Sequence, residues 1–338
     1  MHKPQIIINM AQTIFIYPSG GQGPQSSNPY VQNMKDSLRK YYNVLQPTYK
    51  KRLPRMLVFL LNSFKADIYI LNWIEDSAAA RGGMLGGILS MLGLFIVSRR
   101  RAKLVWIFHN IHPHNGETHW SKYFRRFLFK HCFFIVAHSQ EAANYAKSFS
   151  SCPVFFKNHP IKKQKFKKWE GEVQQYDFLI WSDILSYKGV PEFVENPIWK
   201  QSKKKLLIIG KSENEEIRKR IELCVNENIT YEDRFAPYSE ISSLCKKSKY
   251  VLFPYIGDSI SSSGVLMDTL LMGGTPVGPN RGAFADLATQ KCCIIYNNID
   301  EVFFLPDDNK LDQKEISKFI KENTWEAFGL WLHKKIDN

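Results

Sequence analysis

Four small residues, Ser261, Ser262, Ser263 and Gly264, stand at the start of a helix expected over 264–273. The first amides of a helix have no partner within it, and the helix dipole is positive there, so such a segment attracts anions. Lys188 follows an expected strand, 177–181, and offers a point charge for the same purpose. Alone, each feature is more often an ordinary helix cap or a surface lysine. Together they predict a site for a phosphate-bearing ligand.

Other small and polar residues also follow expected strands, which is where parallel sheets bind their ligands. Gly20 and Gly21 come shortly after 13–17, and glycine lets the backbone approach a ligand closely. The remaining candidates for contacts to the same ligand are Ser182, Gly210, Lys211, Pro254, Tyr255, Asp268 and Thr269.

Five further residues are candidates for proton transfer, because imidazole and carboxylate groups are the usual general acids and bases. They are His109, His112 and His114, at and after one strand end, and Glu75 and Asp76 after another. A surface or packing role explains His112 and His114 equally well, and a helix-capping role explains Asp76 at least as well. The sequence holds no D-x-D pair and no His/Cys group at zinc spacing, so we expect no metal site.

Apolar strand-like runs alternate with helix-like stretches, a pattern typical of parallel sheets with helical crossovers. Strands are expected at 13–17, 68–73, 104–109, 133–137, 177–181, 205–209, around 231, and at 250–254, 275–277 and 292–296. Helices are expected at 31–41, 54–63, 77–98, 119–130, 213–227, 239–247, 264–273 and 312–335. We therefore predict an α/β chain with two doubly wound, Rossmann-like domains, 1–165 and 166–315, followed by a segment, 316–338, that returns to the first.

The charge is unevenly distributed along the 338 residues. Residues 1–170 hold 25 Lys and Arg against 7 Asp and Glu, a net of +18, whereas residues 171–338 hold 21 against 25, a net of −4. A basic domain attracts nucleic acid or an anionic membrane, although a solvated basic face is the common case. Aromatic residues are interleaved with Arg125, Arg126 and Lys130 on the helix 119–130, and around 161–169. This favours a membrane surface over nucleic acid, for which no motif is present.

The longest apolar stretch, 84–97, is too short to span a membrane and contains three glycines. We interpret it as a core helix. The six cysteines are scattered, as in proteins of a reducing cytosol.

Several segments, in this order, resemble GT-B glycosyltransferases, close to the family-4-type enzymes of bacterial surface and capsular polysaccharide synthesis. They are Asn72-Trp73, Trp106-Ile-Phe-His-Asn-Ile-His-Pro-His114, Tyr187-Lys-Gly189, Leu252-Phe-Pro-Tyr255 and Ser263-Gly264 through Gly274-Thr-Pro-Val277. The resemblance implies two domains facing each other across a cleft. It also implies sugar transfer from a UDP- or GDP-type nucleotide sugar, without metal or other cofactor, to a hydroxyl of a lipid-linked oligosaccharide.

The resemblance also implies roles for single residues. His109 would lie near the donor sugar, Lys188 would meet the diphosphate, and Ser261 to Gly264 would cradle phosphate and ribose. Many retaining members carry two glutamates at the positions of Ser261 and Thr269, so the stereochemistry and the ribose contact stay open. Asp268, roughly 100° round the helix from Thr269, does not simply replace the second glutamate.

Three alternatives stay open beside sugar transfer by a cytoplasmic enzyme on the inner face of the cell membrane. The first is a sugar-nucleotide epimerase of the same fold, which would need more carboxylates near the donor. The second is a basic nucleic-acid-binding protein. The third is a catalytically inactive partner subunit, suggested by the missing glutamate pair.

Overall fold

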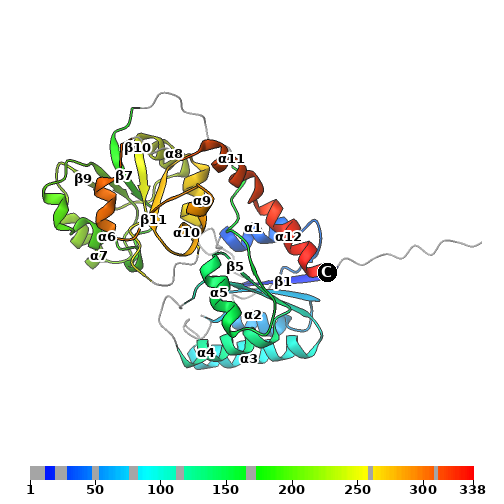
Figure 1. Cartoon of the computed structure of the whole chain (residues 1–338). Helices are drawn as coiled ribbons and strands as arrows, with labels where there is room; N and C mark the ends of the chain where they lie inside the picture. The colour runs from blue at the N-terminus through cyan, green and yellow to red at the C-terminus, as the bar shows by residue number, and fades with distance from the viewer. Residues whose placement is uncertain are drawn as a thin grey trace, which may run out of the picture. The chain divides into compact units, whose positions relative to one another are not determined.

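The computed structural model describes residues 12–19, 29–47, 53–75, 83–111, 118–164, 173–257, 262–307 and 311–338. They form two compact units (Figure 1). The first comprises 1–137, 143–156 and 325–338, and the second comprises 138–142 and 157–324. The boundaries predicted from the sequence lie after residues 165 and 315, whereas the contacts change units after Phe156 and Thr324.

The first unit contains a six-stranded parallel sheet in the order β2-β1-β3-β4-β5-β6. Its strands are β1 (Thr13–Tyr17), β2 (Asn43–Val44), β3 (Ile68–Asn72), β4 (Lys103–Phe108), β5 (Phe134–Ala137) and β6 (Val154–Phe156). The central strands are apolar at nearly every position, because helices cover both faces of the sheet and both sets of alternating side chains are buried.

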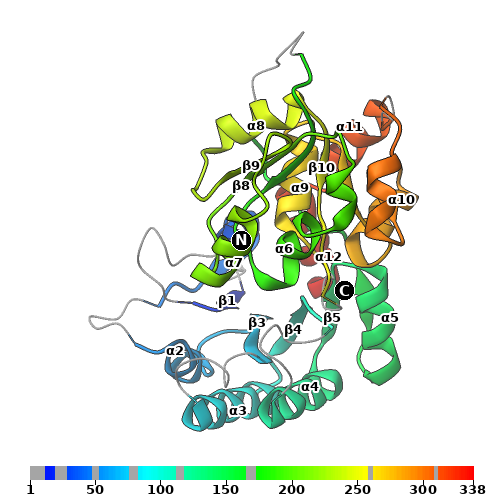
Figure 2. The same cartoon turned by 90° about the vertical axis from the view of Figure 1, so that its left-hand side faces the viewer.

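The helices of the first unit are α1 (Pro29–Leu38), α2 (Arg55–Asn62), α3 (Gly83–Arg99), α4 (His119–His131), α5 (Gln140–Phe149), whose first residues belong to the second unit, and α12 (Trp325–Asp337). Figures 1 and 2 show α2, α3 and α4 together on one face of this sheet, with α1 and α12 on the other. Successive residues of a strand point to opposite faces of the sheet. Ile14 therefore packs with residues of α1 and α12, whereas Phe15 contacts Phe59 of α2.

The last helix completes the core of the first unit. Trp325, Phe328, Leu332 and Ile336 recur at helical spacing and are buried among strands β1, β3 and β4. The backbones of α1 and α12 approach closely at Gly329, where a Cβ would lie 2.7 Å from the carbonyl oxygen of Ser37. The predicted return of the chain to its first domain is therefore confirmed.

The second unit contains another six-stranded parallel sheet, in the order β12-β11-β10-β7-β8-β9. Its strands are β7 (Tyr176–Trp181), β8 (Leu206–Ile209), β9 (Ile229–Glu232), β10 (Ser248–Leu252), β11 (Pro276–Pro279) and β12 (Ile294–Tyr296). Its helices are α6 (Val190–Val194), α7 (Glu215–Glu222), α8 (Tyr238–Lys247), α9 (Gly264–Leu271), α10 (Gly282–Thr289) and α11 (Gln313–Glu322), with 3₁₀ turns η2 (Ser186–Lys188), η3 (Pro197–Lys200) and η4 (Ile299–Phe304).

The predicted fold class, two doubly wound α/β units, is confirmed. Several elements were not expected: the short strands β2 and β6 and the helices α5, α6 and α10. The expected terminal helix over 312–335 is two helices, α11 and α12, which belong to different units. The interpretation of 84–97 as a core helix is wrong for one side of α3, since Met84, Leu85, Ile88, Leu92 and Phe95 are exposed.

Replacing Phe328 with alanine is expected to lower the free energy of unfolding by about 3–5 kcal/mol, because the ring is 1% exposed and its loss leaves a cavity. Leu330→Ala, in the same helix at 40% exposure, is the control and should cost less than about 0.5 kcal/mol. Urea unfolding of both variants gives the comparison. Equal losses would contradict the inclusion of α12 in the core of the first unit.

Candidate functional site

The strand order of the second unit creates a natural binding crevice. The chain runs from β7 to β8 on one side, and β10 lies on the other side of β7, so the crossover direction reverses between β7 and β10. Parallel sheets bind ligands beyond the carboxyl ends of the strands at such a reversal. Ser182 follows β7 and Pro254 lies just beyond β10, so the predicted residues at these two strand ends are brought together.

Lys188 lies at this reversal with its ammonium group removed from water. The residue is 7% exposed, and its Nζ donates to Ser182 Oγ at 2.8 Å and to the carbonyl oxygen of Asp183 at 2.6 Å. Burial lowers the pKa of Lys188 to about 8, against the opposing attraction of Asp183. An ammonium has three N–H donors, so one more can serve a ligand oxygen. A buried cation at a strand-end crevice suits an anion.

Glycines allow the loops around Lys188 to pack closely against one another. A Cβ on Gly210, after β8, would lie 1.8 Å from the carbonyl oxygen of Ser182. A Cβ on Gly189 would lie 2.2 Å from that of Pro254, and Gly189 has a φ of 65° that favours glycine. Ser182 itself has a φ of 100°, a strained conformation for a residue with a side chain. The loops after β7, β8 and β10 therefore meet through their backbones.

A cavity of about 390 Å³ adjoins this point and is lined from the carboxyl ends of β10, β11 and β12. Its lining includes the predicted Pro254 and Tyr255, together with Arg281, which sequence reasoning missed. Arg281 Nη2 donates to the carbonyl oxygen of Tyr255 at 3.0 Å. The available signal was its place just after β11, at the same edge of the sheet as Lys188 and Tyr255.

The start of α9 is capped from within the protein. Ser263 is buried, and its Oγ accepts from the amide of Leu266 at 3.2 Å, as an N-cap does. The Tyr255 hydroxyl also bonds Ser263. Ser262 is half-buried and Gly264 is exposed. Ser263 thus has the ordinary capping role that was the alternative to phosphate binding, and it also links α9 to Tyr255.

Asp268 and Thr269 point in different directions from α9. Thr269 is fully buried and accepts from Trp181 Nε1 at 3.0 Å, so it faces β7. Asp268 accepts from the hydroxyl of Tyr238, in α8, at 2.8 Å, and burial raises its pKa. The two side chains are hydrogen-bonded to different elements. This agrees with the expectation that Asp268 does not simply replace the second glutamate, whose position is held by Thr269.

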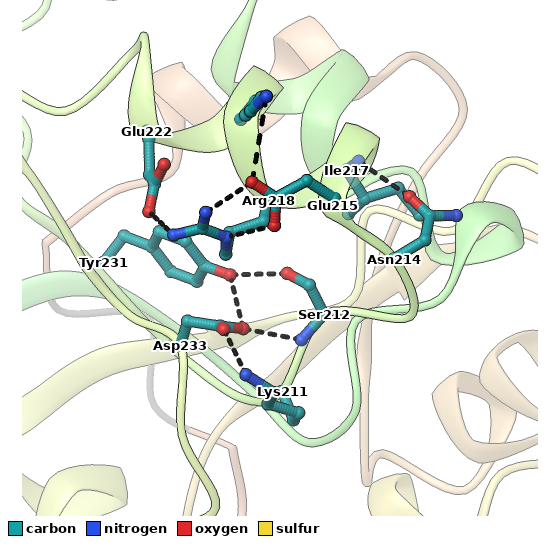
Figure 3. Close-up of polar contacts among 10 residues, drawn as sticks. Lys211, Ser212, Asn214, Glu215, Ile217, Arg218, Glu222, Tyr231 and Asp233 are labelled. Atoms are coloured by element: carbon teal, nitrogen blue, oxygen red, sulfur yellow. Dashed lines mark hydrogen bonds and ion pairs between the residues drawn. The ribbon is translucent and has the colours of Figure 1, made fainter.

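Lys211, which is expected to contact the ligand, forms an ion pair with Asp233 (Figure 3). Their Nζ and Oδ2 atoms are 2.5 Å apart, and Asp233 also accepts from the Ser212 amide and the Tyr231 hydroxyl. Burial opposes ionisation of Asp233, but these hydrogen bonds prevail and lower its pKa to about 2. The charge of Lys211 is therefore largely neutralised, and the group of four residues fixes the loop after β8.

Two histidines of the second unit, the buried His138 and the half-buried His159, lie together although the sequence did not predict them as a pair. His138 and His159 lie with ring centroids 5.3 Å apart, and His159 is the nearest side chain to Gly264. Burial lowers the pKa of His138 to about 4 and that of His159 to about 3. Both are therefore neutral near pH 7. The cationic groups of the second-unit site are Lys188 and Arg281.

In the first unit, His109 lies at the carboxyl end of β4, where it was expected, but is 3% exposed. Asn72 Nδ2 donates to the carbonyl oxygen of Tyr17 at 2.7 Å, so its Oδ1 is the acceptor for His109 Nε2 at 3.1 Å. This arrangement assigns the proton to Nε2. One amide thus joins the ends of β1, β3 and β4.

Aromatic rings hold the His109 imidazole on two sides. Trp73 stacks on it with centroids 4.0 Å apart and planes 14° apart, and Tyr30 meets it edge-on at 4.8 Å. Tyr30 in turn contacts Trp325 of α12. Trp73 has a φ of 51°, so, like Ser182, it is a strained residue directly after a strand. The imidazole is a rigidly placed group.

The remaining predicted residues of the first unit divide into buried and exposed. Glu75 is 4% exposed. Arg125 is also buried, donates to the carbonyl oxygens of Asn110 and Ile111, and lies over the ring of Phe108. Its assignment to a membrane-facing surface is therefore wrong, because its guanidinium faces the interior of the unit. Arg126 and Lys130 are exposed, as expected.

Six predicted site residues lie outside the described residues: Gly20, Gly21, Asp76, His112, His114 and Ser261.

Within the described ranges, no three His, Cys, Asp or Glu side chains come together in a group that could hold a metal ion. No helix in the same part of the chain has both the length and the apolar character needed to cross a membrane.

No protein-family model and no curated protein matches this chain. Solved structures do match over nearly its whole length. HepE of Anabaena, crystallised with UDP and glucose, is 11% identical, with a TM-score of 0.62 over 96% of this chain and 98% of its own. The α,α-trehalose-phosphate synthase (UDP-forming) of Burkholderia vietnamiensis is 8% identical, with a TM-score of 0.62 over 97% and 98%. A glycosyltransferase of Rickettsia africae is 12% identical, with a TM-score of 0.62 over 97% and 99%. The chain has the GT-B fold.

Replacing Gly189 with alanine is expected to destabilise the second unit more than replacing Gly273. Both glycines have a positive φ, so alanine at either costs about 1–2 kcal/mol. Only at Gly189 would the Cβ also meet a backbone oxygen, whereas the nearest atom at Gly273 is a lysine Cε at 3.9 Å. Thermal unfolding measures the difference. Equal midpoints for the two variants would contradict the close contact between the loops after β7 and β10.

Proposed function

We propose that this protein is a glycosyltransferase that moves a sugar from a nucleotide-diphosphate sugar to a hydroxyl group. The observation that carries the proposal is the buried ammonium of Lys188 at the crossover reversal of a GT-B chain. The diphosphate of the donor is the anion that this cation would bind. Arg281, which lines the adjoining cavity of the same unit, offers a second positive charge for that anion.

In such a transfer, the bond between the anomeric carbon and the diphosphate oxygen breaks, and its electron pair leaves with the diphosphate. The acceptor oxygen bonds to the same carbon, and its proton passes to a base. Charge therefore grows on the leaving group, and a preorganised cation stabilises it more in the transition state than in the bound donor. Lys188 supplies that charge without a metal ion.

UDP is the first nucleotide to test. HepE was crystallised with UDP and the trehalose-phosphate synthase forms UDP, and both share the fold over nearly their whole length. The pocket residues described above do not distinguish uracil from guanine, so GDP sugars belong in the same screen.

For the acceptor we propose a lipid-linked glycan, handled by an enzyme on the cytoplasmic face of a membrane. The support is the basic composition of residues 1–170 and the exposed cations Arg126 and Lys130. Glu75 and Asp76 are the candidate bases for the acceptor hydroxyl, with His112 and His114 as further candidates.

One observation favours a second candidate, a binding subunit without activity of its own. Thr269 stands where related retaining enzymes carry a glutamate, and it is buried against Trp181. Such a subunit would bind the nucleotide through Lys188 but transfer no sugar. Turnover of a bound donor therefore separates the two candidates, and products released from the donor alone would identify an epimerase.

Replacing Lys188 with alanine is expected to weaken UDP binding by roughly 10–100-fold, the usual effect of losing a charged hydrogen bond. The loss should be smaller for Lys211→Ala, because Asp233 already neutralises Lys211. Isothermal titration measures both affinities. Unchanged affinity in Lys188→Ala would refute the placement of the diphosphate.

The pH dependence of UDP affinity offers an independent check on Lys188. Its cationic form is populated below its pKa of about 8, and a bound anion raises that pKa. Affinity should therefore decline as the pH rises above about 8, by at most about tenfold per pH unit. Lys188→Arg should abolish this decline, because a guanidinium stays charged. The same slope in Lys188→Arg would assign the titration to another group.

Replacing His109 with alanine is expected to reduce turnover while leaving affinity for free UDP unchanged. The proposed diphosphate site lies in the second unit, whereas His109 belongs to the first and is expected to act on the sugar. His109→Phe, which keeps a ring beside Trp73 but cannot bond Asn72, separates packing from chemistry. Full turnover in His109→Phe would show that the imidazole only fills space.

A further inference from the structure

Helix α3 is packed with its small residues inward. Gly86, Gly87, Ser90 and Gly93 are among its buried residues. A Cβ on Gly87 would lie 2.7 Å from the indole of Trp120, and one on Gly93 would lie 2.7 Å from the ring of Phe59. The helix therefore lies close against α2 and α4, with its small side chains as the contact surface.

The large apolar side chains of α3 point outward as a consequence. Met84 and Leu85 are 69% and 65% exposed, and Ile88, Leu92 and Phe95 are each between 45% and 47% exposed. Positions 84, 88, 92 and 95 fall on one side of a helix. We call these five side chains the α3 stripe. An ordinary surface helix places its charged residues there.

The neighbouring helices extend this apolar surface. Exposed Leu61 and Phe64 lie at the end of α2, and exposed Tyr123 lies on α4. Figures 1 and 2 show the three helices side by side on the same face of their sheet. Large apolar side chains exposed on adjacent helices are typical of an interaction site.

The charged side chains of the helices that carry and flank the α3 stripe have one sign. Helices α2, α3 and α4 contain no Asp or Glu. Arg99 ends α3 with its guanidinium 4.5 Å from the ring centroid of Phe95. Among the described residues, the other exposed cations on or beside these helices are Arg55, Lys65, Arg100, Arg101, Lys122, Arg126 and Lys130. The surface is therefore apolar at its centre and cationic at its edge.

We propose that α3 lies in the plane of an anionic membrane, with the α3 stripe among the acyl chains and the surrounding cations at the lipid headgroups. Interfacial helices bind membranes through this combination of apolar area and positive charge. A second copy of the chain fits less well, because pairing two such surfaces would oppose their cations. Attachment through α3 is independent of the sugar transfer proposed above.

This surface differs from the one expected from the sequence. The aromatic and basic residues of 119–130 suggested that α4 makes the contact, but Arg125 and Phe124 are buried there. The segment 161–169 lies partly outside the described residues. The α3 stripe now provides the apolar part, and Arg126 and Lys130 on α4 provide part of the charge.

The test is co-sedimentation with vesicles of phosphatidylcholine, alone or mixed with phosphatidylglycerol. The protein should bind the mixed vesicles and bind phosphatidylcholine alone weakly. The double variant Ile88→Gln, Leu92→Gln removes two apolar side chains that are already exposed, so the fold should survive. Its partition coefficient should fall roughly tenfold or more, the effect of losing two buried aliphatic side chains.

Matched controls lie in the second unit. Leu223→Gln with Phe304→Gln removes apolar side chains that are 87% and 79% exposed, and should leave vesicle binding unchanged. For the charges, Arg126→Gln with Lys130→Gln should weaken binding to the mixed vesicles, whereas Lys318→Gln with Lys321→Gln on α11 should not.

Three results would overturn the proposal. The first is undiminished vesicle binding by the Ile88, Leu92 variant. The second is equal binding to neutral and anionic vesicles. The third is a dimer that this variant dissociates, without vesicle binding by the parent, which would make the α3 stripe a contact between copies. UDP affinity of the same variant, expected to equal the parent's, shows separately whether the donor site is intact.

Discussion

The burial of a single ammonium group is the constraint on which the second unit depends. Lys188 loses most of its hydration, and among the described residues the Ser182 hydroxyl and the Asp183 carbonyl oxygen replace it as hydrogen-bond partners. An arrangement of this kind is tolerable where the crossover direction reverses, because the crevice is open to an anionic partner. The closely packed Gly189 and Gly210 and the strained backbone of Ser182 allow the loops to meet and so place Lys188 at this reversal.

The first unit shows the same construction with different chemistry. Its crossover direction reverses between β1 and β3, and there the amide of Asn72 bonds both the end of β1 and His109. Trp73, like Ser182, adopts a positive φ directly after its strand. In both units, a residue with a strained backbone follows a strand beside the reversal of the crossover direction. Backbone strain of this kind is typical of functional sites. One site carries a cation and the other an imidazole whose Nε2 donates to Asn72.

Long buried strands could be predicted from the sequence because both of their faces are apolar, whereas β2 and β6 are too short to produce a pattern. Helix α5 was missed because its inner face is built from alanines, Ala142, Ala143 and Ala146, and not from large side chains. Lys188 was predictable because it follows a strand. The neutralisation of Lys211 was not, since its partner Asp233 is distant in sequence. The exposed side of α3 could not be predicted either, because the sequence of a helix that is apolar all round does not indicate which side faces the protein.

The membership of α12 in the first unit affects the order in which the chain can fold during synthesis. The core around β1, β3 and β4 lacks Trp325, Phe328, Leu332 and Ile336 until residues 325–336 have emerged from the ribosome. The second unit, which needs nothing beyond Thr324, can complete its own core first. The usual N-to-C order is therefore reversed, because β1, β3 and β4 wait for native contacts that are translated after the whole of the second unit.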